Sequence, residues 1–159
     1  MIRITDQYFW NFVFTMFFLV MIIMGVIILD SEARIAPGEL TVFDISLMVL
    51  ATFRLIRLFA YDGIAKFFRE QFWDAEKTKT GYVLSKPAKG PRRTLADLFG
   101  CPWCLGMWFG ATVTFFYLWT AYAYLPVLIL AISAVASSLQ IAVNWIGWSA
   151  EKAKRDSGN

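Results

Sequence analysis

The two cysteines of this 159-residue chain stand three positions apart, in the segment Gly100-Cys101-Pro102-Trp103-Cys104. Proline is favoured at the first position of a helix, because its missing N–H would have no partner there anyway. The motif therefore places Cys101 at the N-cap of a predicted helix and Cys104 in its first turn. A helix N-terminus carries partial positive charge and free N–H donors, so it would stabilise a thiolate at this position.

Three interpretations of this cysteine pair remain open. A Cys-x-x-Cys motif at a helix start is typical of thiol–disulfide oxidoreductases, although the usual accompanying βαβ pattern is missing here. A zinc site needs four ligands, and because the chain has no histidine, zinc would require the thiolates of two chains. In the third interpretation the two cysteines are reduced, inert and packed as small hydrophobic residues at a tight helix entry.

A second group of residues could bind an anion or form ion pairs: Arg54, Arg57 and Asp62. The two arginines are three positions apart and share one face of a predicted helix. They could extend to the membrane surface and contact water or lipid phosphate. Alternatively, Arg54 lies roughly 9 Å before the helix end at Ala60, by helix rise, and needs a partner inside the protein. Asp44, near the other end, is predicted to be an interfacial or N-cap residue rather than a transport carboxylate.

No charged residue occurs between Asp97 and Glu151. A single helix of that length would measure roughly 80 Å, far more than one bilayer. We therefore expect the segment to fold back on itself at Tyr124-Leu125-Pro126.

The sequence predicts an all-α membrane protein with four transmembrane helices plus an amphipathic interfacial helix between spans two and three. The predicted spans are residues 9–29, 41–60, 102–122 and 126–148. Apolar residues at helical spacing define the amphipathic helix over residues 61–73, and residues 74–94 are predicted to form a loop. A short surface turn of helix is expected at 94–99. The predicted organisation is an N-terminal helix and external loop (1–40), a three-span core (41–150, with the cytoplasmic segment 61–100) and a charged tail (151–159).

Lysine and arginine positions predict the orientation, because cytoplasmic loops are enriched in them. Segment 61–100 holds eight, the tail holds three, and the first external loop holds only Arg34. We therefore expect a bacterial inner-membrane protein with both termini and the cysteine pair on the cytoplasmic side. The net charge of +3 is too small to predict nucleic-acid binding. The basic residues of segment 61–100 are Lys66, Arg69, Lys77, Lys79, Lys86, Lys89, Arg92 and Arg93.

Small and polar residues predict close helix packing in the last two spans. Gly106 and Gly110 form a G-x-x-x-G motif that permits a close approach of another helix. Four polar residues repeat at spacings of four, three and four, and so share one helix face. The expected result is a tight hairpin of the third and fourth helices with interhelical hydrogen bonds; homodimerisation through the glycine face is the alternative. The four polar residues are Ser133, Ser137, Gln140 and Asn144.

Two motifs resemble a bacterial membrane family catalogued as domain of unknown function 1360. The first is ATFRLIRL at residues 51–58, followed by Tyr61-Asp62; the second is CPWCLGMW at residues 101–108. Together they cover roughly residues 44–144. The resemblance implies that the first span is an addition, since members of this family are usually shorter. It implies a fold outline and a motif in a bacterial or phage protein, but no reaction.

The expected function is a non-enzymatic binding or scaffold protein, or an accessory subunit of a membrane assembly. The alternatives are a membrane thiol oxidoreductase or thiol-metal protein that uses Cys101 and Cys104, and a transporter or channel subunit. No cofactor is expected, apart from zinc shared across an oligomer. The expected partners are the lipid bilayer and either further copies of the chain or a larger membrane complex.

Overall fold

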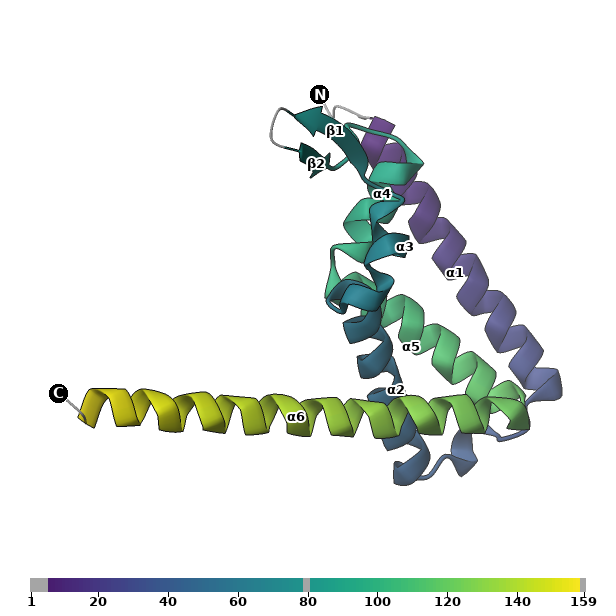
Figure 1. Cartoon of the computed structure of the whole chain (residues 1–159). Helices are drawn as coiled ribbons and strands as arrows, with labels where there is room; N and C mark the ends of the chain where they lie inside the picture. The colour runs from purple at the N-terminus through teal and green to yellow at the C-terminus, as the bar shows by residue number, and fades with distance from the viewer. Residues whose placement is uncertain (1–5, 79–80, 158–159) are drawn as a thin grey trace.

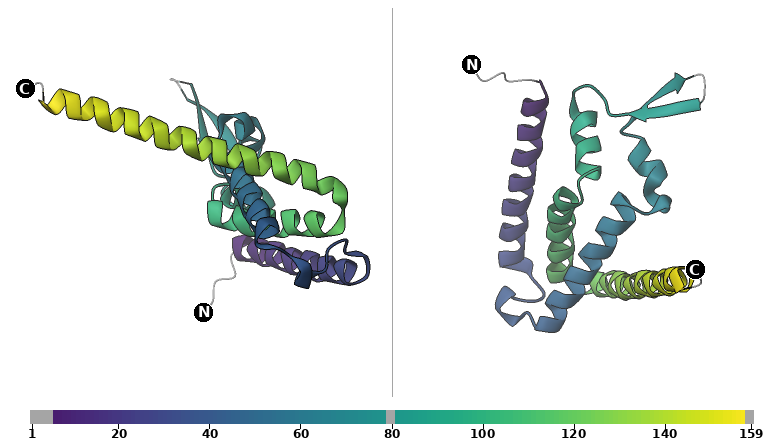
Figure 2. Two further views of the ribbon diagram at one scale, coloured as in Figure 1. Left: turned by 90° about the horizontal axis from the view of Figure 1, so that it is seen from below. Right: turned by 90° about the vertical axis from the view of Figure 1, so that its left-hand side faces the viewer.

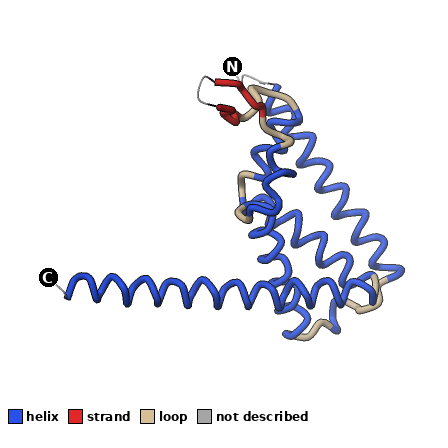
Figure 3. The backbone as a smooth tube through the Cα atoms, in the orientation of Figure 1, coloured by secondary structure: helices blue, strands red, loops and turns tan. Residues whose placement is uncertain are grey.

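The computed structural model describes residues 6–78 and 81–157, and these are predominantly helical. Figures 1 and 3 show a helical body with a small hairpin at one end, and a long helix that crosses the other end and extends away from it. The ends of the predicted N-terminal segment and tail (1–5 and 158–159), and Lys79, lie outside the described residues. The elements are α1 (Asp6–Glu32), η1 (Pro37–Glu39), α2 (Val42–Ala60), η2 (Gly63–Ala65), α3 (Lys66–Glu70), β1 (Asp74–Thr78), β2 (Gly81–Ser85), α4 (Pro91–Phe99), α5 (Pro102–Trp119), η3 (Ala121–Ala123) and α6 (Tyr124–Ser157).

Helix α2 begins with a capping box, as its sequence allows. Thr41 is the N-cap and accepts a hydrogen bond from the backbone N–H of Asp44, while the Asp44 carboxylate accepts one from the Thr41 backbone N–H. This reciprocal arrangement satisfies two backbone donors that have no partner within the helix. The Tyr117 hydroxyl of α5 donates a further hydrogen bond to Asp44, over 2.5 Å. Asp44 therefore helps to cap α2 from position N3, whereas the N-cap position that the sequence suggested for it is occupied by Thr41.

Helix α2 is the centre of the packing, since it contacts both α5 and α6 extensively. Ala51 of α2 and Ala134 of α6 are completely buried, and these small side chains let the two helix backbones approach each other. By contrast, α5 and α6 barely touch. The main cluster of buried side chains consists of Leu47, Met48, Ala51, Val113, Tyr117, Leu118, Val127 and Ala131.

The predicted hairpin of the third and fourth helices is therefore wrong. The glycine face of α5 packs against α2: a Cβ added at Gly106 would lie 3.3 Å from Ile56 Cδ1, and one at Gly110 would lie 3.9 Å from Thr52 Cγ2. The G-x-x-x-G motif does permit a close approach, but the helix that approaches is α2. Since α2 already covers this face, the structure gives no support to homodimerisation through the glycines.

Helix α6 is a single helix of 34 residues that runs across α2 and extends away from the other helices (Figures 1 and 2). The chain reverses at Thr120 and η3, a few residues before the predicted turn at Pro126. Proline is tolerated in the first turn of a helix, and here it lies inside the start of α6. Every residue of α6 from Ser138 to Ser157 is exposed, so its distal half contacts no other described part of the chain.

The segment between α2 and α5 differs from the prediction in two places. The expected amphipathic helix at 61–73 is broken into η2 and the five-residue α3. Ile64 and Phe67 are nevertheless largely exposed, which a segment lying on the membrane surface requires. The expected loop at 74–94 contains the antiparallel hairpin β1–β2, in which Asp74 pairs with Ser85. The expected surface turn at 94–99 is confirmed and begins earlier, as α4.

Within the part of the chain that the structure describes, two helices are long and apolar enough to cross a membrane, α1 and α6, or three if the sharply bent pair α4–α5 is one span. The four predicted spans are therefore not confirmed. Helix α2 is absent from this set, and its three charged residues give the physical reason, because each is costly in a lipid interior. They are Asp44, Arg54 and Arg57.

Candidate functional site

The cysteine pair lies at a right-angled corner of the chain. Helices α4 and α5 meet at 90°, with Gly100 and Cys101 between them. The Gly100 N–H donates to the Ala96 carbonyl and the Cys101 N–H donates to the Leu98 carbonyl, so the backbone is paired up to the corner. The Cys101 carbonyl then accepts from the Leu105 N–H, which begins α5.

Cys101 and Cys104 are joined by a disulfide bond, with their Cα atoms 5.3 Å apart. Cys101 is the N-cap of α5 and its Sγ accepts a hydrogen bond from the Cys104 backbone N–H over 3.2 Å. Both predicted positions, N-cap and first turn, are therefore confirmed. Cys104 is exposed and Cys101 is half-buried, so the cysteine pair lies at the surface of the bundle and not in its core.

Aromatic packing holds this corner in place. The Phe99 ring, two residues before Cys101, stacks on the Phe72 ring with centroids 5.3 Å apart, and also contacts Phe68 and Phe59. These side chains come from α2, α3, the segment after α3, and α4. Such pairs contribute roughly 0.5–1.5 kcal/mol each beyond the area they bury. The cluster thus fixes the end of α4, and with it the position of the N-cap cysteine.

Charged groups lie on the other side of the corner. Asp97 of α4 forms ion pairs with Lys86 over 2.7 Å and with Arg93 over 3.1 Å. Arg92 pairs with Asp74 of β1 over 3.1 Å, which ties the hairpin to α4. Lys86 and Arg93 share the single Asp97 carboxylate, so this cluster keeps a net positive charge, to which the partial charge of the α5 N-terminus adds.

Beside the cysteines, two large apolar side chains are exposed. Trp103, which lies between the two cysteines in the sequence, is 88% exposed. Met107, one turn further along α5, is 63% exposed. Exposed apolar side chains next to a reactive group are suited to holding an apolar segment of another molecule, or to resting against a lipid surface.

The second predicted cluster contains an inward-facing ion pair. The Arg54 guanidinium donates to Asp62 Oδ2 over 2.8 Å through Nη1, and to Ser133 Oγ of α6 over 2.9 Å through Nε. The two charged side chains are 19% and 28% exposed. Arg54 therefore faces other helices and has an acidic partner, which was one of the two alternatives drawn from the sequence. The residue that sequence reasoning missed is Ser133, whose spacing predicted a packing face but not an arginine partner.

Arg57, unlike Arg54, has no acidic partner among the described residues. Its side chain makes no hydrogen bond or ion pair with any described residue, and its Nε is enclosed without a partner. The third arginine nearby, Arg69, donates to the carbonyls of Phe59 and Ala60 and so satisfies the end of α2. The structure thus brings Arg54 and Asp62 together, as proposed, and leaves Arg57 outside that pair.

The other predicted packing residues of α6 form hydrogen bonds within that helix. Ser137 donates to the carbonyl of Ser133 within the helix. Gln140 donates to Asn144 Oδ1 over 3.0 Å, and both side chains are exposed. The interhelical hydrogen bonds expected from these four residues are therefore limited to the one between Ser133 and Arg54.

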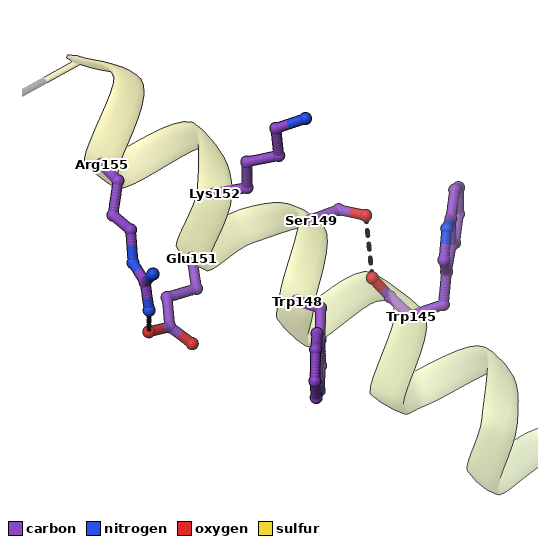
Figure 4. A pocket seen from close by; sticks show the side chains of 6 residues that line it. All are labelled: Trp145, Trp148, Ser149, Glu151, Lys152 and Arg155. Atoms are coloured by element: carbon purple, nitrogen blue, oxygen red, sulfur yellow. Dashed lines mark hydrogen bonds and ion pairs between the residues drawn. The ribbon is translucent and has the colours of Figure 1, made fainter.

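Two hollows lie on the surface of the protein. One, of about 420 Å³, is lined entirely by side chains of the last turns of α6, where tryptophans give way to charged residues (Figure 4). A hollow with one helix for its wall is a surface feature, and its sequence of aromatic and then charged side chains is typical of a membrane boundary. The other, of about 690 Å³, is an apolar groove between α1 and α5. Neither contains Arg54, so they do not supply the water-filled cavity that a transport role would require.

Among the described residues, no three histidine, cysteine, aspartate or glutamate side chains gather closely enough to hold a metal ion. With their sulfurs bonded to each other, Cys101 and Cys104 offer no thiolate in this state. Zinc shared between two chains stays a prediction.

Taken together, these features define a class: a small helical protein with two or three helices able to cross a membrane, and a Cys-Pro-Trp-Cys pair at a helix start. Within that class, the chain belongs to the family described as Protein of unknown function (DUF1360), which matches residues 47–143. The family resemblance seen in the two sequence motifs is thereby confirmed. The match leaves out α1, as expected of an added first helix.

The chain is also similar to a protein of a named bacterium. The chain is 29% identical over 100 residues to the UPF0713 protein YngL of Bacillus subtilis (strain 168), which covers 61% of this chain and 75% of the relative. No solved structure matches the chain. Neither comparison specifies an activity.

Proposed function

We propose that this chain is a bacterial inner-membrane protein that exchanges thiols and disulfides through Cys101 and Cys104. The observation that carries the proposal is the bond between the two sulfurs at the N-terminus of α5. The sequence alone favoured an inert packing role for the cysteines. Two bonded cysteines at the protein surface favour the redox alternative instead, because an inert role would leave two thiols buried in apolar surroundings.

The proposed orientation places the cysteine pair on the cytoplasmic side. The N-terminal end of α1, helix α4 and the hairpin lie at one end of the molecule (Figure 1). Lys77 of β1 and Arg92 and Arg93 of α4 belong to that end, which favours the cytoplasm, and the lysines and arginine of the tail favour the same side for the C-terminus. Since the cytoplasm keeps most thiols reduced, the resting state there is the dithiol.

The reaction begins from this dithiol. The thiolate of Cys101 attacks one sulfur of a substrate disulfide; a mixed disulfide forms and the other substrate sulfur leaves as a thiolate. Cys104, after losing its proton to solvent, attacks Cys101 Sγ, which forms the intramolecular disulfide and releases the second substrate thiolate. The substrate gains two electrons and the cysteine pair loses two. A cytoplasmic low-molecular-weight thiol or a reduced dithiol protein then restores the starting state.

The geometry assigns the two cysteines different tasks. Cys101 Sγ already accepts the Cys104 N–H and lies at the positive end of α5, so a negative charge on it is stabilised. Cys104 is one turn into the helix and close enough to reach Cys101 without a change in the backbone, since the two are bonded in this structure. We therefore assign Cys101 as the nucleophile and Cys104 as the resolving cysteine.

A redox titration of the purified protein in detergent or lipid tests the proposal. We expect the pair to interconvert in one two-electron step with a midpoint between about −270 and −180 mV, the range of exchanging dithiols. Equilibration with glutathione buffers, acid quenching and alkylation of the free thiols measure it. A midpoint below about −300 mV would identify a structural disulfide, and stoichiometric zinc in the reduced protein would favour the thiol-metal alternative.

A binding or scaffold role is the second candidate. The observation that favours it is the distal half of α6, which contacts no other described part of the chain. The two candidates differ in one outcome: replacing both cysteines with serine would abolish a redox role and leave a scaffold role intact.

A further inference from the structure

The distal half of α6 carries a polar stripe that lies on an otherwise apolar, unpartnered helix. Ser137, Gln140, Asn144 and Gly147 are spaced by three, four and three residues, so they lie on one helix face with a heptad-like period. Asn144 and Gly147 are exposed, as is Gln140, whereas Ser137 is half-buried where α6 leaves α2. The large side chains around the stripe are exposed and apolar, including Leu139, Ile141 and Val143.

The tryptophans near the end of α6 show how deep this stripe would lie in a bilayer. Helix α6 qualifies as a membrane span, and its aromatic-to-charged transition runs from Trp148 to Glu151 (Figure 4). With that transition at the headgroups, Asn144 lies roughly 6 Å and Gln140 roughly 12 Å inside, by helix rise. Both carboxamides would then lie within the hydrocarbon region or at its edge.

Within the chain these carboxamides are only partly satisfied. Gln140 donates one N–H to Asn144 Oδ1. That bond leaves the Gln140 carbonyl oxygen, its second N–H and the Asn144 amino group exposed on the helix surface, without a hydrogen bond to any described residue. Lipid cannot supply partners for these groups, and leaving them unpaired in hydrocarbon is costly.

We infer that two copies of this chain associate in parallel through this face of α6. A carboxamide has both a donor and an acceptor, so Gln140 and Asn144 are each complementary to the same residue of a second copy. Copies inserted with the same orientation meet in parallel about a twofold axis, which brings identical residues opposite each other. Ser137 and Gly147 flank the carboxamides, and their small size lets the two backbones approach closely enough for hydrogen bonds.

A neighbouring exposed face, about 100° around the helix, provides a matched control. Leu139 and Val143 belong to an apolar stripe of the same helix that lipid solvates without cost. If hydrophobic packing rather than carboxamide pairing held the copies together, that stripe would be the contact. We therefore expect substitutions of the carboxamides to weaken association, and substitutions at the adjacent apolar positions to leave it nearly unchanged.

The association is measured by energy transfer between donor- and acceptor-labelled protein in phosphatidylcholine vesicles, over a range of protein-to-lipid ratios. We expect the wild-type chain to dimerise. The double substitution Gln140→Leu with Asn144→Leu should weaken association roughly tenfold or more, while Leu139→Ala with Val143→Ala should change it less than threefold. Unchanged circular dichroism in each variant checks that the helices remain folded. A monomeric wild-type chain, or the reverse ranking of the two variants, would overturn the inference.

Cross-linking tests the parallel arrangement independently of fold stability. In a chain with Cys101→Ser and Cys104→Ser, Asn144→Cys should form an intermolecular disulfide under mild oxidation. Trp145→Cys, one residue further and about 100° around the helix, should form it at least fivefold less. Equal cross-linking at both positions would contradict a parallel pair centred on this stripe. Because the redox cysteines are absent, failure here would leave the proposed thiol exchange untouched.

Discussion

Substitution of Cys104 by serine is expected to trap the protein as a mixed disulfide on Cys101, whereas substitution of Cys101 should nearly abolish adduct formation. With Cys104 absent, nothing resolves the intermediate after Cys101 attacks a disulfide. With Cys101 absent, the remaining sulfur lacks the N-cap position and its hydrogen bond from the helix backbone. We expect the two variants to differ at least tenfold in the rate of adduct formation.

The measurement uses each single variant with glutathione disulfide, followed by acid quenching and mass determination of the intact protein. The double variant with both cysteines replaced is the control and should form no adduct. Equal rates for the two single variants would contradict the assignment of separate tasks, and a faster rate at Cys104 would reverse it.

Loss of the Arg54–Asp62 pair is expected to have the largest effect on stability. Arg54→Met leaves the Asp62 carboxylate and Ser133 without their partner in a partly buried site. Breaking a buried pair from one side costs about 3–5 kcal/mol, and partial exposure of these side chains reduces our expectation to about 2–3 kcal/mol. The free energy of unfolding in mixed detergent micelles measures the change.

The chain offers two matched comparisons for this result. Glu151→Gln breaks an ion pair with Arg155 in which both side chains are more than half exposed, and should cost about 0.5 kcal/mol or less. Replacing both partners, Arg54→Met with Asp62→Leu, leaves no unpaired charge and should recover most of the lost stability. If Arg54→Met and Glu151→Gln lowered the free energy of unfolding equally, the Arg54–Asp62 pair would contribute no more to stability than a surface ion pair.

The features that could be predicted from sequence are those set by neighbours along the chain. Hydrophobic length predicts α1, and Pro102 after Cys101 predicts where α5 begins. Asp44 is acidic and lies near the start of α2, and these two features predict a capping role. In each case the determining feature lies within one continuous segment, so the local sequence contains it.

The features that could not be predicted depend on contacts between distant segments. Nothing local indicates that α2, rather than α6, would cover Gly106 and Gly110. The partnership of Arg54 with Ser133 joins residues 79 positions apart. The hairpin β1–β2 had a weak signal in the Tyr-Val-Leu run of residues 82–84, outweighed by the polar residues before it. Helix α3 ends after five residues although its apolar spacing would permit a longer helix.

The number of membrane spans shows the same difference between features set by the local sequence and features set by contacts between distant segments. Length and apolar content alone favoured α2 as a membrane span. Its central place between α5 and α6 provides partners for Asp44 and Arg54, and these contacts let charged residues occupy a helix of that length. Sequence reasoning identified the unusual residues, whereas their partners appear only in the folded chain.

The redox state of Cys101 and Cys104 in living cells tests the account most directly. Growing cells are quenched with acid and free thiols are alkylated, before and after a brief pulse of the thiol oxidant diamide. We predict a mostly reduced pair at rest, oxidation to the disulfide during the pulse, and recovery within minutes, with no labelling of intact cells by a membrane-impermeant maleimide. A pair that stays oxidised throughout, or that the impermeant reagent labels from outside, would contradict the proposed exchange on the cytoplasmic side.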